Sequence, residues 1–244
     1  MAPVKNKIPE KIKGMQRNII KTEDGSHTLY VDELNEHYHS THGAIKESEH
    51  VFIQHGFHNA GKWLNPLNIL EIGFGSGLNA LLTFRENQKE NRKINYIAVE
   101  PYPLSKDETN TLNYPKLVSF DNADKIYSSL HKPSESPFFI GDNFILLPLH
   151  QKIQDINLKE ESINVIYFDA FSPSVSPEMW EGKIFKKLYD ALEWQGVLVT
   201  YSASGQVKRT LKEAGFSLEH PEGPQGKREI TVAKKQKSWS EILS

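Results

Sequence analysis

Short apolar runs alternate with amphipathic stretches along most of the chain, and this order predicts an α/β fold. Apolar runs that end in an acidic or polar residue are typical of buried parallel strands. Apolar positions at helical spacing between them predict connecting helices. The alternation favours a mostly parallel sheet with helices on both faces, and ligands beyond the carboxyl ends of its strands. The expected strands are 68–72, 94–99, 138–140, 165–168 and 196–200, and the expected helices are 78–84, 182–194 and 205–214.

The two ends of the chain carry different patterns. Residues 18–31 hold two β-prone runs around Asp24-Gly25, which predicts a hairpin. Residues 46–61 have apolar positions at roughly helical spacing. Residues 216–219 and 228–233 predict a final strand pair, so that the last strand of the sheet is reversed.

Length and composition fit one domain with additions. The chain has 244 residues, of which 38% are hydrophobic and 25% charged, so disorder throughout is excluded. We expect an N-terminal extension (1–60, with a basic leader, a hairpin and a helix) packed on the main domain (61–235), and a C-terminal tail (236–244).

The absence of cysteine excludes disulfides, thiolate metal ligands and cysteine nucleophiles. No apolar run reaches the length of a membrane span, and the basic N-terminus lacks the apolar stretch of a signal peptide. We therefore expect a cytoplasmic protein with no membrane partner.

The net charge of -2 conceals an asymmetry. Residues 1–21 carry six bases and one acid, residues 205–244 eight bases and five acids, and the middle fifteen bases and twenty-five acids. Basic ends on an acidic body favour binding of a polyanion, although solvated lysine-rich termini explain the same pattern.

A glycine cluster, Glu71-Ile72-Gly73-Phe74-Gly75-Ser76-Gly77, follows the first strand and opens a helix. Leu78 stands where the dinucleotide fingerprint needs its third glycine, and the phosphate loop G-x-x-x-x-G-K-[ST] is absent. The spacing E-x-G-x-G-x-G resembles motif I of class I methyltransferases, which use S-adenosylmethionine. A tight turn without a ligand is the alternative.

The fourth strand ends in Asp169-Ala170-Phe171-Ser172-Pro173, followed by Pro177-Glu178-Met179-Trp180. A short polar-proline-aromatic motif occupies this place in amino-group methyltransferases. An alkylamine is only about a thousandth neutral at pH 7, a cost of roughly 4 kcal/mol, and a carboxylate can orient it or take its proton. An aromatic side chain can stack on a flat base. The alternatives are that Asp169 caps a helix and that Trp180 anchors the core.

The chain as a whole resembles the tRNA wobble-uridine methyltransferases that make 5-methylaminomethyl-(2-thio)uridine from the 5-aminomethyl form. This family occurs as one half of bifunctional MnmC proteins or alone as MnmD. The resemblance spans about residues 28–233, with modest departures at Ser76, Ala80 and Ser176. It is carried by LEIGFGSGLNAL (70–81), AVEPYPL (98–104), GDN (141–143), FDAFSPSVSPEMW (168–180), TYSASGQVKRTLKEAGF (200–216) and GPQGKREI (223–230).

The resemblance implies a Rossmann-like class I methyltransferase fold, S-adenosylmethionine as donor and tRNA as acceptor. Glu71 would support the methionine end, Glu100 would accept from both ribose hydroxyls, and Asp142 would lie near the adenine amino group. The implied cofactor-binding residues are Glu71, Gly73, Gly75, Gly77, Asn79, Glu100, Asp142, Asp169 and Tyr38; the implied catalytic residues are Asp169, Phe171 and Pro173.

Trp180, Lys208, Arg209, Lys227 and Arg228 are the candidate tRNA contacts. The resemblance also implies that the flavin-dependent oxidase half is absent from this chain, so that another enzyme would supply the aminomethyl substrate.

Seven of the ten histidines lie in 27–58, but no H-E-x-x-H is present, and we expect no metal.

Two other functional hypotheses stay open. The main functional alternative is a transferase acting on a small amine, including aminopropyl transfer to a polyamine. A binding module without catalysis is a third possibility, against which the Asp169 cluster argues.

Overall fold

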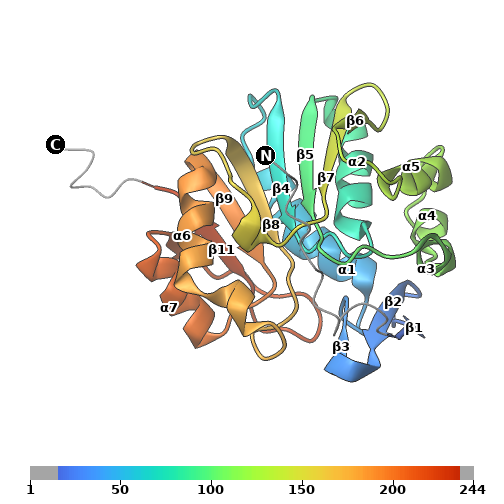
Figure 1. Ribbon diagram of the computed structural model, residues 1–244, viewed down its shortest axis with the longest axis horizontal. Coiled ribbons are helices and arrows are strands. Elements are labelled where there is room, and N and C mark those ends of the chain that lie inside the picture. The colour runs from blue at the N-terminus through green and yellow to red at the C-terminus, as the bar shows by residue number, and fades with distance from the viewer. Residues whose placement is uncertain (1–15, 237–244) are drawn as a thin grey trace, which may run out of the picture.

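The computed structural model describes residues 16–236 and shows a large twisted sheet between two layers of helices (Figure 1). The sheet order is β10 (Ser217–Glu219), β11 (Thr231–Lys234), β9 (Leu192–Thr200), β8 (Ile163–Phe168), β4 (Leu67–Ile72), β5 (Ile94–Val99), β7 (Phe144–Leu149) and β6 (Phe138–Phe139). Its five central strands are parallel. At one edge β11, the last described strand, runs antiparallel to them, and β10 pairs antiparallel with β11. The mostly parallel sheet with a reversed last strand is therefore confirmed.

Each face of the sheet buries its own apolar core. Alternate side chains of one strand point to opposite faces, so Leu67 and Ile69 of β4 join one cluster, and Leu70 and Ile72 the other. Figure 1 shows α6 and α7 on one side of the sheet and α2 on the other. The helices are α1 (Ala44–Ser48), α2 (Leu78–Glu90), α3 (Lys106–Thr111), α4 (Tyr114–Leu117), α5 (Ala123–Leu130), α6 (Gly182–Ala191) and α7 (Gly205–Glu213).

No helix within residues 16–236 combines the length and the apolar character that crossing a bilayer requires.

The third parallel strand differs from the sequence prediction. Residues 138–140 were expected to form it, but β6 is a two-residue antiparallel edge strand, and the parallel strand is β7, directly after it. Asp142 lies in the turn between them, beside the start of β7, where Ile94 pairs with Phe144. The turn is therefore at the amino edge of the sheet. The apolar run 144–149 was overlooked because the acidic turn before it resembled a strand end.

The N-terminal residues form a small second sheet and a helical segment. The predicted hairpin is confirmed as β1 (Arg17–Lys21) and β2 (His27–Val31), and β3 (Glu36–His37) adds a short strand that the sequence did not predict. The predicted helix at 46–61 is observed as α1, a π-helical stretch (Glu49–Gln54) and a 3-10 turn (Phe57–Asn59). The expected basic leader and C-terminal tail fall largely outside the described residues.

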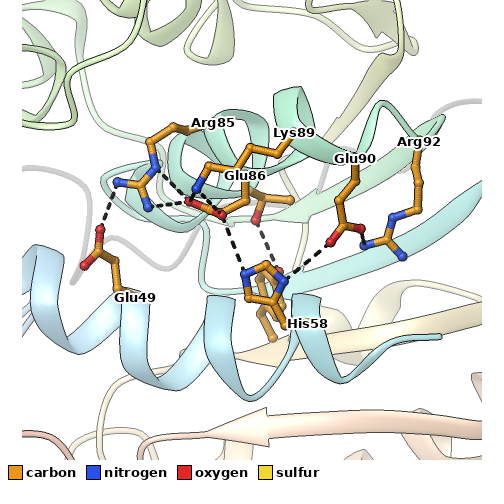
Figure 2. Close-up of polar contacts among 9 residues, drawn as sticks. Glu49, His58, Arg85, Glu86, Lys89, Glu90 and Arg92 are labelled. Atoms are coloured by element: carbon orange, nitrogen blue, oxygen red, sulfur yellow. Dashed lines mark hydrogen bonds and ion pairs between the residues drawn. The ribbon is translucent and has the colours of Figure 1, made fainter. Parts of the chain in front are cut away.

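An ion-pair network fastens this helical segment to α2, as Figure 2 shows. Glu86 binds Arg85 and Lys89, both at 2.9 Å, and Arg85 also reaches Glu49 at 2.8 Å. His58 lies 3.6 Å from both Glu86 and Glu90. Burial would raise the pKa of Glu86, but the hydrogen bonds and charges of Lys89 and Arg85 outweigh it and lower that pKa. Because α1 continues into this segment, the network also fixes α1.

The turn after β7 is organised by one lysine. Lys187 of α6 donates to the carbonyl oxygens of Ile153, Gln154 and Ile156, each at 2.9 Å. These carbonyls belong to a 3-10 turn (Ile153–Asp155) and its following residue. An ammonium has three protons, so this arrangement satisfies all of them. The turn is thereby fixed at the carboxyl edge of the sheet.

Lys187→Met should lower the free energy of unfolding by about 2 kcal/mol, because partly buried carbonyls lose a charged donor. Urea denaturation measures the change. Lys186→Met is the matched control: Lys186 is exposed and pairs with Asp190 one helical turn away, a contact expected to contribute under about 0.5 kcal/mol. Equal losses in the two variants would contradict the assigned role of Lys187.

Candidate active site

The glycine loop leaves β4 in a conformation and an environment that exclude side chains. Gly73 has φ +87°, and a Cβ there would lie 2.3 Å from the backbone oxygen of Asp169. A Cβ on Gly75 would meet the Tyr38 ring at 3.0 Å, and one on Gly77 would meet His131 at 2.8 Å. The three glycines are therefore required by close approach, and they bring the ends of β4 and β8 together.

Glu100 closes β5 with its carboxylate directed at the glycine loop. One oxygen accepts from the Gly75 N–H and the other from the Tyr102 N–H, both at 2.9 Å. Tyr38 lies over Gly75 and meets the Phe171 ring edge-on, with centroids 5.2 Å apart. Burial, followed by the charge of Glu100, raises the pKa of Tyr38. The structure thus brings three predicted cofactor residues, Glu100, Gly75 and Tyr38, into one wall.

A buried polar relay supports Asp169 from behind. The Asn79 side-chain amide donates to Glu71 at 2.9 Å and to Asp169 at 2.8 Å. The Tyr96 hydroxyl donates to the other oxygen of Glu71 at 2.8 Å. Glu71 and Asn79 are buried and do not line the cavity described below, so they act on it through Asp169. Tyr96 was not singled out from the sequence, where it reads as an ordinary strand aromatic.

Asp169 has a strongly shifted pKa and lines the cavity. Its pKa is raised to about 7, mainly by burial and in addition by the charge of Glu47. The hydrogen bond from Asn79 and the charge of Lys227 act in the opposite direction. Near neutral pH the carboxyl group therefore exchanges a proton readily, which suits a general base.

These residues surround a cavity of about 740 Å³ at the carboxyl edge of the sheet. It is lined by the glycine loop, Glu100 and Tyr38, and also by Asp169, Phe171 and Tyr201. Ser172 donates to Glu36 of β3 at 2.7 Å, so the small N-terminal sheet is tied to the Asp169 turn. The volume lies within the usual range of small-molecule sites.

Asp142 was predicted to lie near the adenine, and the structure contradicts this placement. Asp142 is exposed at the opposite edge of the sheet and does not line the cavity. The residues after the third parallel strand that do line the cavity are Lys152, Ile153 and Gln154, and Gln154 carries the side-chain amide among them. Its Oε1 atom is buried without a hydrogen-bond partner, while its Nε2 lies 3.6 Å from Met179 Sδ. Gln154 was missed because β7 was missed.

Trp180 was predicted to contact tRNA, but it is a core residue. It is only 5% exposed and packs against Phe168, with ring centroids 4.9 Å apart. Its indole N–H donates to the Phe171 carbonyl at 2.8 Å. The sequence alternative of a core anchor is therefore correct. Phe171 itself lines the cavity, whereas Pro173 is half-buried in the turn and does not.

The four basic candidates fall into two groups. Arg209 and Arg228 are exposed, and Lys208 pairs with Glu229 at 2.5 Å. Lys227 instead lies in the cavity wall and contacts Glu47, a buried carboxylate that the sequence did not single out. A shallow hollow lined by Tyr201, Lys227 and Arg228 adjoins the cavity.

His37 and His39 line the cavity, and His39 is buried with its ring 2.8 Å from Ser76 Oγ. Burial lowers the pKa of His39 to about 4, so it is neutral at pH 7. Among residues 16–236, no group of three or more histidine and acidic side chains is arranged to hold a metal ion.

The residues present fit S-adenosylmethionine. The backbone at Gly73 and Gly75 lines the cavity, so a ligand can lie directly against the loop. Glu100 offers a buried carboxylate that can accept from two hydroxyls, and Gln154 offers an unpartnered amide oxygen to an amino group. Hydroxyl and amino donors of a nucleoside match these acceptors.

Comparison with known proteins supports this chemistry. Residues 141–236 match the model of a family described as S-adenosyl-L-methionine-dependent methyltransferases. The chain is 30% identical to the tRNA 5-methylaminomethyl-2-thiouridine biosynthesis bifunctional protein MnmC of Legionella pneumophila, covering 89% of this chain and 36% of that protein. The Burkholderia thailandensis protein of the same name is 28% identical, covering 83% and 33%. The chain thus spans about a third of the length of these relatives.

Solved structures confirm the fold. MnmC2 from Aquifex aeolicus superposes with a TM-score of 0.73 at 24% identity, covering 95% of this chain and 75% of that one. Spermidine synthase from Thermotoga maritima gives a TM-score of 0.56 at 14% identity, covering 91% and 69%. The resemblance, the class I methyltransferase fold and S-adenosylmethionine as cofactor, all predicted from the sequence, are confirmed.

Glu100→Ala should weaken binding of S-adenosylhomocysteine by about tenfold or more, because a buried acceptor of hydroxyl donors is lost. Gln154→Leu should weaken it by about threefold to tenfold. Asp142→Ala, which removes an exposed carboxylate at the far edge, should leave the affinity unchanged. Calorimetric titration measures all three. A loss in Asp142→Ala with none in Gln154→Leu would restore the original assignment.

The raised pKa of Asp169 also predicts a pH-dependent stability. The folded pKa of about 7 exceeds the unfolded value of about 3.9, so folding takes up a proton between these values. Wild-type stability should therefore fall as the pH rises from 4 to 7, relative to Asp169→Asn, which stays neutral. Melting temperatures across this range test the prediction. The exposed Asp142→Asn is the control, and a melting difference between Asp169→Asn and wild type that is constant with pH would exclude the assigned shift.

Proposed function

We propose that this protein methylates the aminomethyl group of 5-aminomethyl-(2-thio)uridine at the wobble position of tRNA, giving 5-methylaminomethyl-(2-thio)uridine. The observation that carries the proposal is the position of Asp169: its half-buried carboxylate lines the cavity and accepts from the Asn79 amide at 2.8 Å, and burial raises its pKa to about 7. The names of the curated relatives, which refer to biosynthesis of this nucleoside, support the choice of substrate.

Bound S-adenosylmethionine supplies an electrophilic methyl group, so the accepting amine needs a free electron pair. A primary amine arrives mostly as its ammonium form at neutral pH. Asp169 can receive a hydrogen bond from that ammonium and then take its proton, because the two pKa values are brought closer by burial of the carboxyl group. Asn79 keeps the carboxylate in place through its hydrogen bond of 2.8 Å.

Two aromatic rings give the acceptor end a shape suited to a flat base. Phe171 presents its ring to the cavity and is fixed by Tyr38 on one side and by the Trp180 N–H on its carbonyl. Tyr201 is fixed by its hydroxyl, which donates to the Ala170 carbonyl at 2.8 Å. Aromatic faces are the usual partners of an unstacked nucleobase.

Arg209 and Arg228, both exposed, are the candidate phosphate contacts, and Arg228 lines the hollow that adjoins the cavity. Lys208 is paired with Glu229 and its side chain is only 22% exposed, so we assign it a smaller part in phosphate binding. Contacts of this kind make tRNA affinity fall with rising salt.

The direct test uses tRNA that carries 5-aminomethyl-(2-thio)uridine. Purified protein and S-adenosylmethionine should add one methyl group to that nucleoside, read as 14 mass units after digestion (an expected gain of about one CH₂). Asp169→Ala should lower the rate by about a hundredfold or more while keeping most of the affinity for the donor. Asp142→Ala is the control of equal charge change.

Transfer to free polyamines with none to tRNA would instead support the small-amine transferase. Near-normal turnover of Asp169→Ala would remove Asp169 from the mechanism.

A further inference from the structure

One buried carboxyl group lies on a face of β4 that is otherwise apolar. Alternate side chains of a strand share a face, so Glu71 points the same way as Leu67 and Ile69, which belong to the core cluster that α2 covers. Glu71 is 0% exposed and does not line the cavity. A charge in such a position costs free energy unless a cation or several donors compensate it. The partners of Glu71 therefore decide whether it is charged.

The described residues offer Glu71 two neutral partners but no cation. The Asn79 amide donates to one of its oxygens at 2.9 Å, and the Tyr96 hydroxyl contacts the other at 2.8 Å. No lysine, arginine or histidine among the described residues forms an ion pair with Glu71. The charged groups that face it are Asp169 and Glu100, and both are acids. Glu71 is therefore opposed by like charges and balanced by no opposite one.

The three acids that meet at this edge of the sheet have different surroundings. Glu100 accepts from two backbone N–H groups, each at 2.9 Å. Asp169 is half-buried and lines the cavity, where its charge can be solvated. Glu71 has neither advantage, although it and Asp169 accept from the same Asn79 nitrogen and so lie close together. When two carboxyl groups share a site, one of them keeps its proton, and the less solvated member is the one expected to do so.

The titration behaviour of these groups agrees with this geometry. Burial raises the pKa of Glu71 well above its usual range, and the charges of Asp169 and Glu100 act in the same direction. The hydrogen bonds from Tyr96 and Asn79 oppose the increase without cancelling it. Tyr96 and Tyr167, the tyrosines packed beside Glu71, are themselves neutral, because burial raises the pKa of both hydroxyls.

A neutral acid satisfies both hydrogen bonds of Glu71. Its carbonyl oxygen accepts from Asn79, and its hydroxyl can donate to Tyr96, since a tyrosine hydroxyl both donates and accepts. The Asn79 amide is then held with a hydrogen toward Asp169, to which it donates at 2.8 Å. An ionised Glu71 would make the same contacts, but it would place a second negative charge behind Asp169.

We propose that Glu71 carries a proton at neutral pH and, as a neutral acid, orients the Asn79 amide toward the ionised form of Asp169. Glu71 is thus a positioning residue, and it does not reach the cavity where donor and acceptor would lie. The single negative charge of the pair is placed on the carboxylate that an amine can approach. The benefit to the reaction rests on the proposed function, whereas the proton on Glu71 does not.

The first test is thermal unfolding of wild type and Glu71→Gln between pH 4 and pH 8. An unfolded glutamate has a pKa of about 4.3 and the buried Glu71 a higher one, so above about pH 4.3 folding takes up a proton. Wild-type stability should therefore fall with rising pH relative to Glu71→Gln, which resembles the neutral acid and does not titrate. The melting temperature of Glu71→Gln minus that of wild type should rise by at least about 5 °C between pH 4.5 and pH 7.5.

Asp142→Asn is the control for this measurement. Asp142 is exposed, so the difference between its melting temperature and that of wild type should stay nearly constant over the same range. A difference for Glu71→Gln that is constant or decreases with rising pH would mean that the folded protein holds an ionised Glu71. That result would overturn the inference.

The second test is the pH dependence of single-turnover methylation of aminomethyl-tRNA, with saturating protein and donor. Glu71→Gln removes no charge if Glu71 is neutral, so the apparent pKa of the rate should change by less than about 0.3. Removal of an ionised Glu71 would instead lower the pKa of Asp169, and the apparent pKa of the rate would fall by about one unit or more. A purely structural role would not predict which of these shifts occurs.

Glu71→Leu tests the orientation of Asn79. It removes the acceptor that holds the amide, so Glu71→Gln should retain at least about ten times the rate of Glu71→Leu. Binding of S-adenosylhomocysteine establishes that both variants are folded, and equal rates would remove Glu71 from the positioning of Asp169. If wild-type protein methylates no aminomethyl-tRNA, the proposed function fails, while the melting temperatures still decide whether Glu71 carries a proton.

Discussion

The structure depends on how two buried carboxylates are kept at one edge of the sheet. Glu71 and Asp169 would repel each other in an apolar interior, and burying an unpartnered charge is costly. One amide group, that of Asn79, donates to both. Tyr96 completes the partners of Glu71, and the glycines of the loop allow the strand ends to approach closely enough for this relay. Cavity, loop and catalytic turn are all arranged around it.

The cavity is built from two sets of segments that differ in their origin in the fold. Its nucleoside end is built by consecutive strands and their loops, as the α/β architecture dictates. The remaining wall is assembled from the N-terminal extension, the turn after β8 and the loop between β10 and β11. The first part explains the likeness to methyltransferases in general, while the second is where this chain can define its acceptor. Such a division is common, because function resides in sites added to a shared fold.

The sequence was most informative where local pattern and chemistry coincide. The Gly73-to-Gly77 loop, Glu100 and Asp169 each end or follow a buried strand, and all three lie where that pattern predicts. Asp142 was misplaced because the sequence alone does not show whether an acidic turn precedes or follows a strand. Only the pairing of the strands shows that. Trp180 was misassigned because residue type does not reveal which way a side chain points, and the place of Lys227 in the cavity wall was not foreseen for the same reason. Glu47 could not be found at all, since its role depends on a partner 180 residues away.

That separation has a consequence for how the molecule is made. Residues 71–100 contain the glycine loop and Glu100, so the donor end of the cavity can begin to organise once the first two parallel strands have been synthesised. The acceptor end cannot close until the loop that carries Lys227 has left the ribosome, because contacts between distant segments form only after both exist. A chain truncated before β10 would therefore carry Glu47 and Asp169 in the cavity wall without the Lys227 ammonium that contacts Glu47.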